Sequence, residues 1–411
     1  MKNTKLAVAI AVALLPFGAL ADSDIGPGAH VHGESGQDHH AMHDQRSDQP
    51  WEFYGALYLA LQYNDPGKVA DHDGNQPAGN LWLNSEGTTL GLRGTVPLHH
   101  GLKGVWQIES LINIDQFGDP PDGHAHGTEP ATYNDSELAG GHNSFLGLSG
   151  DWGTFLGGKH NTPYFDATLK FDLFHHLAGD VRAVMGRIPG VESGSGDHHG
   201  GTFNVSASNT LMYKTPDFRG LSAEVAYFGL NETRIKQSEK PRGYGVTGRY
   251  DHKAFTVLAS YEAHDNYDTY EDAAGETIDT TEGMMAGGMI KLFDGKTIVG
   301  AFVEQLKTED ASAAIPDDKR NGYYMNLRQR LTPRNALHVA YGVADDFVGN
   351  DGGEFLAAGI FHDIGPMAQV YALYVGTDNE TGSNYSTGAV GPLNNGGDPS
   401  TFAIGAMYHY K

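Results

Sequence analysis

Cysteine is absent from the 411 residues of this sequence. Without thiols the chain forms no disulfide, no thiolate metal site and no iron–sulfur cluster, and it has no cysteine nucleophile. Its fold must therefore be held by packing and hydrogen bonds, and a metal site would have to use imidazole and carboxylate ligands.

Long apolar runs are also missing. Residues 6–15 form an apolar stretch that is too short to cross about 30 Å of hydrocarbon as a helix, and no run of 18 apolar residues follows it. The stretch follows Lys2 and Lys5 and precedes Ala19-Leu20-Ala21, a small-x-small cleavage site. We therefore predict a secretory signal peptide over residues 1–21. The exported chain is then either soluble or crosses a membrane as strands.

Positive charge is scarce. The sequence has 27 Lys and Arg against 51 Asp and Glu, which gives a formal charge of −24. Loss of Lys2 and Lys5 with the signal removes two positive charges from −24 and leaves −26 on the mature chain. No nucleic-acid partner is expected, because phosphates are repelled by an acidic surface without a basic face.

Residues 22–50 contain almost no bulky apolar side chains and are rich in histidine and aspartate. Such a segment buries too little apolar surface to offset its ordering entropy, so we predict that it is disordered. Closely spaced imidazoles bind Zn²⁺, Cu²⁺ or Ni²⁺, which predicts weak divalent-metal binding and no other cofactor. The candidate metal ligands are His30, His32, His39, His40 and His43.

From residue 51 onward, apolar and polar side chains alternate in short segments separated by Gly, Asp, Asn and Pro. Leu57, Leu59 and Leu61 fall on one face of such a segment, and this period of two is typical of a strand. About sixteen segments share the pattern: 53–63, 86–96, 103–113, 143–150, 153–160, 203–214, 220–230, 243–250, 253–264, 281–292, 296–307, 319–331, 334–346, 353–362, 366–377 and 400–410.

A soluble β-sandwich would show the same alternation. However, several polar faces carry large charged residues, which a closed soluble core would not accept unpaired. Most segments are about ten residues long, the length of a tilted membrane strand, and tight links alternate with long ones. These features favour an all-β transmembrane antiparallel barrel of about sixteen strands over residues 51–411.

Several motifs support this interpretation. They are Phe53-Tyr54-Gly55, Leu90-Gly91-Leu92-Arg93-Gly94, Gly101-Leu102-Lys103-Gly104-Val105-Trp106, Gly147-Leu148-Ser149-Gly150-Asp151-Trp152-Gly153, Asn161-Thr162-Pro163-Tyr164 and Asn209-Thr210-Leu211-Met212-Tyr213. On these motifs the chain resembles the general trimeric porins of Gram-negative outer membranes over most of residues 52–411. The resemblance implies a homotrimer in outer-membrane lipid that passes small hydrophilic solutes and ions by passive diffusion.

In such porins the third long loop, which follows the fifth strand, folds into the lumen and presents acids opposite basic wall residues. The resemblance places this loop at about residues 161–202 and its acids at Asp166, Asp172 and Asp180. The positions that match the basic wall hold Ala56 and Thr89, so we expect a cation-preferring pore. The bases that remain as candidate constriction residues are Arg93, Lys159, Arg328 and Arg330.

Two other functions stay open on the sequence. The first is a metal-binding or metal-uptake barrel that uses the histidine-rich segments. The second is a barrel hydrolase, which is disfavoured because no HExxH, GxSxG or Walker motif occurs in a convincing context. We therefore expect that the protein is not an enzyme.

The proposed register makes a prediction about substitutions. Leu90 and Leu337 are expected to contact lipid or a neighbouring subunit, and lysine at either should cost about 2–4 kcal/mol if that site lies near the bilayer midplane. Lysine at Thr89 or Ala340 should be mild because these residues are expected to face water.

Overall fold

The structure of the protein, a computed structural model, describes residues 49–67, 78–85, 87–115, 142–188, 191–192, 202–229, 241–265, 269–270, 280–309, 318–347, 349–389, 391–392 and 394–410. The predicted signal peptide and almost all of the predicted disordered segment lie outside these residues.

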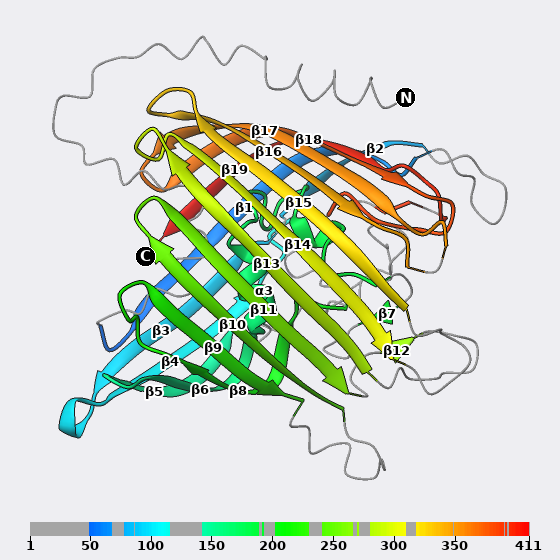
Figure 1. The fold of residues 1–411 in the computed structure, drawn as a ribbon. Coiled ribbons are helices and arrows are strands. Elements are labelled where there is room, and N and C mark those ends of the chain that lie inside the picture. Colours follow the sequence, from blue (N-terminus) through cyan, green and yellow to red (C-terminus); the bar gives the residue numbers. More distant parts are fainter. Residues whose placement is uncertain are drawn as a thin grey trace.

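Antiparallel strands form nearly all of the regular structure (Figure 1). The strands of the main sheet are β1 (Glu52–Asp65), β2 (Asn80–Asn84), β3 (Thr89–Pro97), β4 (Lys103–Leu111), β5 (Ser144–Gly150), β6 (Gly153–Asn161), β8 (Ser206–Lys214), β9 (Leu221–Phe228), β10 (Arg242–His252), β11 (Phe255–Asp265), β13 (Thr280–Leu292), β14 (Thr297–Glu309), β15 (Asp318–Arg330), β16 (Asn335–Ala344), β17 (Gly353–Gly365), β18 (Ala368–Asn379) and β19 (Ser400–Tyr410). Because β1 pairs with β19, from Gly55 opposite Tyr410 to Asp65 opposite Ser400, the sheet closes into a barrel.

The described residues contain seventeen strands in this sheet, but β2 and β3 pair in turn with the two halves of β1. They are therefore two parts of one barrel strand, and the barrel has sixteen strands when this pair is counted once, as predicted. The strand is interrupted between the end of β2 at Asn84 and the start of β3 at Thr89, and the Thr88 hydroxyl accepts a hydrogen bond from Tyr58 N at 2.9 Å. Within the described ranges, no helix is both long and apolar enough to cross a membrane.

The two faces of each strand follow the predicted alternation. On β1, Leu59, Leu61 and Tyr63 are exposed, whereas Tyr58 and Ala60 are buried. Because the barrel is closed, the exposed apolar rows form its outer surface and the buried rows face the interior. A lipid environment suits such an exterior, which in water would be an unusually large apolar surface.

A chain segment between β6 and β8 lies inside the ring of strands (Figure 1). It contains helix α3 (Pro163–Leu169) and the short 3₁₀ helix η2 (Val181–Ala183). The hydroxyl of Thr162 caps α3 by accepting from Phe165 N, and Pro163 occupies its first turn, where no N–H is needed. Two further short strands, β7 (Val191–Glu192) and β12 (Thr269–Tyr270), pair with each other, and the 3₁₀ helix η1 (His99–Gly101) joins β3 to β4.

The interior of the barrel is largely a protein core. Phe171 and Phe174 of the inner segment are fully buried, and Phe171 packs against Phe302 of β14 in a tilted arrangement with ring centroids 5.1 Å apart. Phe361 of β17 packs against Phe174 at 6.1 Å, and Tyr371 of β18 belongs to the same apolar cluster. The inner segment therefore packs directly against the wall strands that contribute to this cluster.

This packing corrects one expectation. Thr89 and Ala340 face inward as predicted, but they are only 3% and 1% exposed and do not face water. Lysine at either position would bury a charge in a packed site, so it is not expected to be mild.

Leu90→Lys is expected to lower the free energy of unfolding by about 2–4 kcal/mol. Leu90 is on the outer face near the middle of the interrupted strand formed by β2 and β3, where a lysine would lie near the bilayer midplane. Leu337→Lys should cost only about 0–1 kcal/mol, because Leu337 lies near the end of β16, where a lysine reaches the interface. Urea unfolding in lipid vesicles checks both values. Equal losses would show that the register or the depth is misplaced.

Candidate constriction site

A buried ion pair holds the inner segment, residues 161–188, to the wall. Arg320 Nη2 of β15 donates to Glu304 Oε1 of β14 at 3.0 Å, and neither side chain is exposed. The Glu304 carboxylate also accepts from Tyr164 Oη at 3.0 Å and from Gly186 N at 3.0 Å. Arg320 further donates to the Val184 carbonyl at 3.1 Å. This charge pair therefore fixes both ends of the inner segment on one patch of wall.

Polar wall side chains hold the backbone of the inner segment at three more points. The Thr247 hydroxyl donates to the Pro163 carbonyl at 2.7 Å. The Asn326 amide donates to the carbonyl of Phe171, and the His338 Nδ1 lies 3.3 Å from the carbonyl of Leu173. Because backbone carbonyls buried away from water require partners, these contacts make the position of the segment specific.

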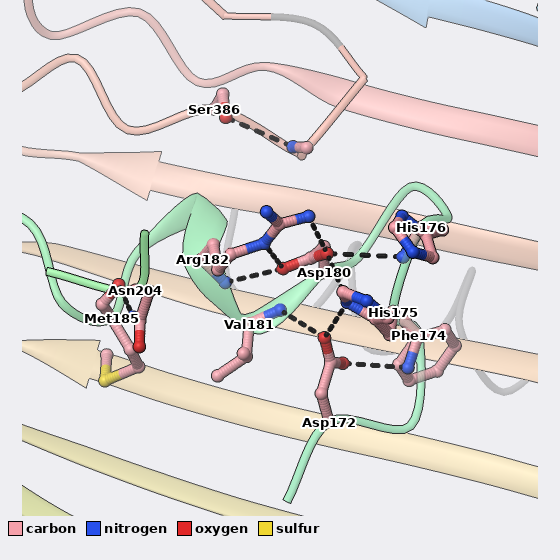
Figure 2. Close-up of polar contacts among 11 residues, drawn as sticks. Asp172, Phe174, His175, His176, Asp180, Val181, Arg182, Met185, Asn204 and Ser386 are labelled. Atoms are coloured by element: carbon pink, nitrogen blue, oxygen red, sulfur yellow. Dashed lines mark hydrogen bonds and ion pairs between the residues drawn. The ribbon is translucent and has the colours of Figure 1, made fainter. Parts of the chain in front are cut away.

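Two of the three predicted constriction acids are engaged within the inner segment itself (Figure 2). Asp172, 2% exposed, accepts from Phe174 N at 2.9 Å and from Val181 N at 3.4 Å. Asp180, 5% exposed, forms a two-pronged ion pair with Arg182, whose Nε and Nη2 donate at 2.9 and 2.8 Å. Neither carboxylate faces the solvent, so the expectation that they line the pore is revised.

The surroundings move the pKa values of these two carboxyls apart. Burial and the negative charge of Asp180 raise the pKa of Asp172 to about 6. Burial acts in the same direction on Asp180, but the Arg182 guanidinium and a hydrogen bond from His175 outweigh it, and the pKa of Asp180 lies well below its usual value. The charge of Asp180 is therefore neutralised locally by Arg182.

Only five residues between 161 and 188 are not buried, and they form the accessible set: Asp166, Lys170, His176, Arg182 and Arg187. Asp166 and Lys170 are four residues apart and share the one face of α3 that is not packed. Asp166 pairs with Lys214 Nζ of β8 at 3.3 Å. The inner segment thus presents three bases and one acid to the remaining lumen.

Sequence reasoning missed Lys170, Arg182, Arg187 and Lys214. A signal for the first was present, because residues 163–169 carry only one charge, that of Asp166, and a helix over them leaves Asp166 and Lys170 on one face. Arg182 and Lys214 could not be found in this way, since their partners are set by the tertiary fold.

The four predicted wall bases lie at separate places. Arg93 pairs with Glu52 at 2.6 Å and stacks over the Tyr54 ring, 4.3 Å from its centroid. Lys159 is half-buried at an irregularity in the pairing of β6 with β8. Arg328 is buried on the inner face of β15, and Arg330, at the end of that strand, donates to the Pro333 carbonyl at 2.8 Å. They do not form a continuous ladder, and their influence on ions stays a prediction.

The predicted metal ligands His30, His32, His39, His40 and His43 lie outside the described residues. Their metal binding therefore stays a prediction.

Comparison with known proteins agrees with this architecture. The family model of Gram-negative porins matches residues 7–382. Outer membrane porin protein 32 of Delftia acidovorans is 29% identical over 177 residues, which are 43% of this chain and 40% of that protein. Major outer membrane protein P.IA of Neisseria meningitidis serogroup C is 24% identical over 148 residues, 36% of this chain and 30% of that protein. The chain thus aligns with less than half the length of these relatives.

Solved structures show the same fold over a larger share. The anion-selective porin from Comamonas acidovorans superposes with a TM-score of 0.70 at 19% identity, covering 88% of this chain and 99% of that one. The outer-membrane protein OmpT of Vibrio cholerae gives 0.59 at 14% identity, covering 89% and 99%. With a family match across residues 7–382 and a closed barrel of sixteen strands, in which β2 and β3 count as one, the chain belongs to the Gram-negative porin family.

Proposed function

We propose that the protein is an outer-membrane channel, not an enzyme, through which small hydrophilic solutes and ions diffuse passively. The observation that carries the proposal is the closed barrel with an apolar exterior and an inner segment that buries all its apolar side chains. This segment turns only charged and imidazole groups to the lumen. We infer that a hydrated path passes these polar groups, while the closed pairing of the described strands satisfies their backbone groups against lipid.

Reconstitution into planar lipid bilayers tests this function. We expect stepwise increases of conductance in potassium chloride, each from the insertion of one assembly. A folded protein that inserts into vesicles, as judged by protease protection, but gives no conductance would contradict the proposal.

The ion preference of the pore depends on the charges of the accessible set. The sequence predicts a cation-preferring pore, but Asp172 and Asp180 are buried and Asp166 is paired with Lys214. Arg182 is likewise paired with Asp180, which leaves Lys170 and Arg187 as the other charges of the accessible set. We therefore propose a constriction that favours anions, because charges in a narrow, low-dielectric passage act on ions more strongly than solvated charges outside it.

The acidic remainder of the chain opposes this preference. Most of the formal charge of −24 lies away from the inner segment, and solvated charges are screened over about 8 Å at physiological salt. We expect the anion preference to strengthen as salt rises from about 0.01 M to about 0.15 M, since the screening length shortens from about 30 Å over this range. Reversal potentials in potassium chloride gradients of fixed ratio measure this trend. A preference for cations at every salt concentration would restore the sequence-based expectation.

We also propose a homotrimer in outer-membrane lipid. Support comes from the family and from the exposed apolar rows of the outer surface, such as Leu146, which is 70% exposed. Sedimentation in detergent measures the assembly, and a monodisperse monomer that still conducts would contradict it.

The alternative of a metal-uptake barrel is not favoured, since the matched relatives are named porins. Metal binding by the N-terminal histidines remains compatible with a porin. Deletion of residues 22–50 distinguishes a metal-uptake barrel from a porin that also binds metal. If conductance is unchanged and zinc or copper binding is lost, the segment is an addition that the channel does not need.

A further inference from the structure

Three side chains of types that can bind a metal ion, Asp172, His175 and Asp180, converge inside the inner segment (Figure 2). His175 Nδ1 lies 3.3 Å from Asp180 Oδ2 and 3.7 Å from Asp172 Oδ2. The three ligand atoms are all within 4.8 Å of one another, and all three residues are buried. No role in ion passage accounts for this cluster, because its carboxylates do not reach the solvent.

The spacing agrees with the size of a zinc site. Zinc binds imidazole nitrogen at about 2.0–2.1 Å and carboxylate oxygen at about 2.0–2.2 Å, and tetrahedral ligands at such lengths are about 3.3–3.6 Å apart. The measured separations of 3.3 and 3.7 Å lie at this edge length. One imidazole with two carboxylates is a ligand set that suits Zn²⁺, whose borderline character tolerates both nitrogen and oxygen.

Backbone groups already hold these ligands in place. Phe174 N and Val181 N donate to Asp172, and His176 N donates to Asp180 at 3.3 Å. Hydrogen bonds of this kind orient metal-binding carboxylates in characterised sites. The fold of the segment therefore orders these side chains before an ion binds, which lowers the conformational entropy that is lost on binding.

His176 lies beside the cluster, but the three converging ligand atoms belong to Asp172, His175 and Asp180. Its ring is 3.7 Å from that of His175, centroid to centroid, and its Nε2 is buried. A zinc ion would therefore take three protein ligands from the cluster, and a water molecule would fill the fourth position.

Arg182 works against a bound cation. Its guanidinium donates to both oxygens of Asp180, so it competes for Asp180 Oδ2 and repels a positive ion. The competition between Arg182 and a bound cation for Asp180 should therefore lower the zinc affinity of the site. It also provides a test, because removal of the guanidinium should raise zinc affinity if the cluster binds metal, whereas it would only break an ion pair if the cluster is purely structural.

We propose that Asp172, His175 and Asp180 form a zinc-binding site with three protein ligands in the inner segment. The site lies next to Arg182 of the accessible set, so bound zinc adds positive charge beside the constriction. The proposal does not depend on conduction, since binding is measurable on the folded barrel in detergent.

Isothermal titration with zinc chloride tests the site in the full chain. The background carries glutamine at His30, His32, His39, His40 and His43, so that N-terminal imidazoles do not contribute. We expect one zinc per chain. His175→Gln and Asp172→Asn should each weaken binding by at least about ten-fold, whereas Arg182→Gln should tighten it. His362→Gln is the matched control, because His362 lies on the wall strand β17, where its Nδ1 bonds Asn335, and it should leave zinc affinity unchanged.

The difference in electrophoretic mobility between unheated and heated samples, together with circular dichroism, establishes that each variant is folded. A folded parent chain that takes up no zinc would overturn the proposal and leave a proton-stabilised ion cluster in its place. Affinity that survives His175→Gln, or that falls with Arg182→Gln as it does with Asp172→Asn, would overturn it equally.

Discussion

Arg320→Met is expected to lower the free energy of unfolding by about 3–5 kcal/mol, the cost of leaving a buried charge without its partner. Glu304 would keep its hydrogen bonds from Tyr164 and Gly186, but these are dipoles and do not replace a full positive charge. Since Arg320 also holds the Val184 carbonyl, the end of the inner segment near η2 should loosen as well. Urea unfolding in vesicles, followed by tryptophan fluorescence, measures the stability, and protease cleavage of the inner segment reports the loosening.

A double substitution distinguishes a broken charge pair from lost packing. Glu304→Gln with Arg320→Met removes both charges, so it should be less destabilising than the sum of the single changes. Arg249→Met is a suitable control, because Arg249 forms its 2.6 Å pair with Asp251 in a more exposed place and should cost only about 0–1 kcal/mol. If Arg320→Met cost no more than this control, the buried pair would not be what anchors the inner segment.

The barrel was predictable because its signal is local. A strand that faces lipid on one side and packed or polar groups on the other must alternate at period two, and Leu57 to Tyr63 show this without any knowledge of their partners. The interruption between β2 and β3 was not predictable. It depends on the hydroxyl of Thr88 bonding the backbone of Tyr58, thirty positions away.

The candidate site was predictable only in outline. The loop expected over residues 161–202 includes the inner segment, yet the interpretation of its acids assumed that a charged side chain in a loop faces water. The composition of residues 163–177 argues against that assumption, because Phe165, Phe171 and Phe174 need a core. A loop with its own core has an inside, and Asp172 satisfies backbone donors there. Which acids are buried is decided by turn geometry, and no periodicity records it.

The charges of the accessible set should determine ion preference. Coulomb's law gives about 0.6 kcal/mol for a unit charge about 7 Å away in water, or roughly a threefold change in local ion concentration. Lys170→Gln with Arg187→Gln is therefore expected to shift the permeability ratio of chloride to potassium several-fold toward potassium. Neither residue holds the inner segment to the wall in the contacts described above, so the fold should persist. The reversal potential in a potassium chloride gradient measures the shift.

Two further variants separate the constriction from net charge. Lys253→Gln removes one positive charge, as Lys170→Gln alone does, but from an exposed residue between β10 and β11, and it should leave the reversal potential nearly unchanged because solvated charges are screened. Asp166→Asn should move the preference further toward chloride, since it removes the one acid of the accessible set and a partner of Lys214. A shift toward potassium with Asp166→Asn, or equal shifts at Lys253 and Lys170, would mean that the overall charge of the protein governs selectivity. Opposite shifts at Asp166 and Lys170, with none at Lys253, would locate the control of selectivity on the exposed face of α3 and the turn that follows it.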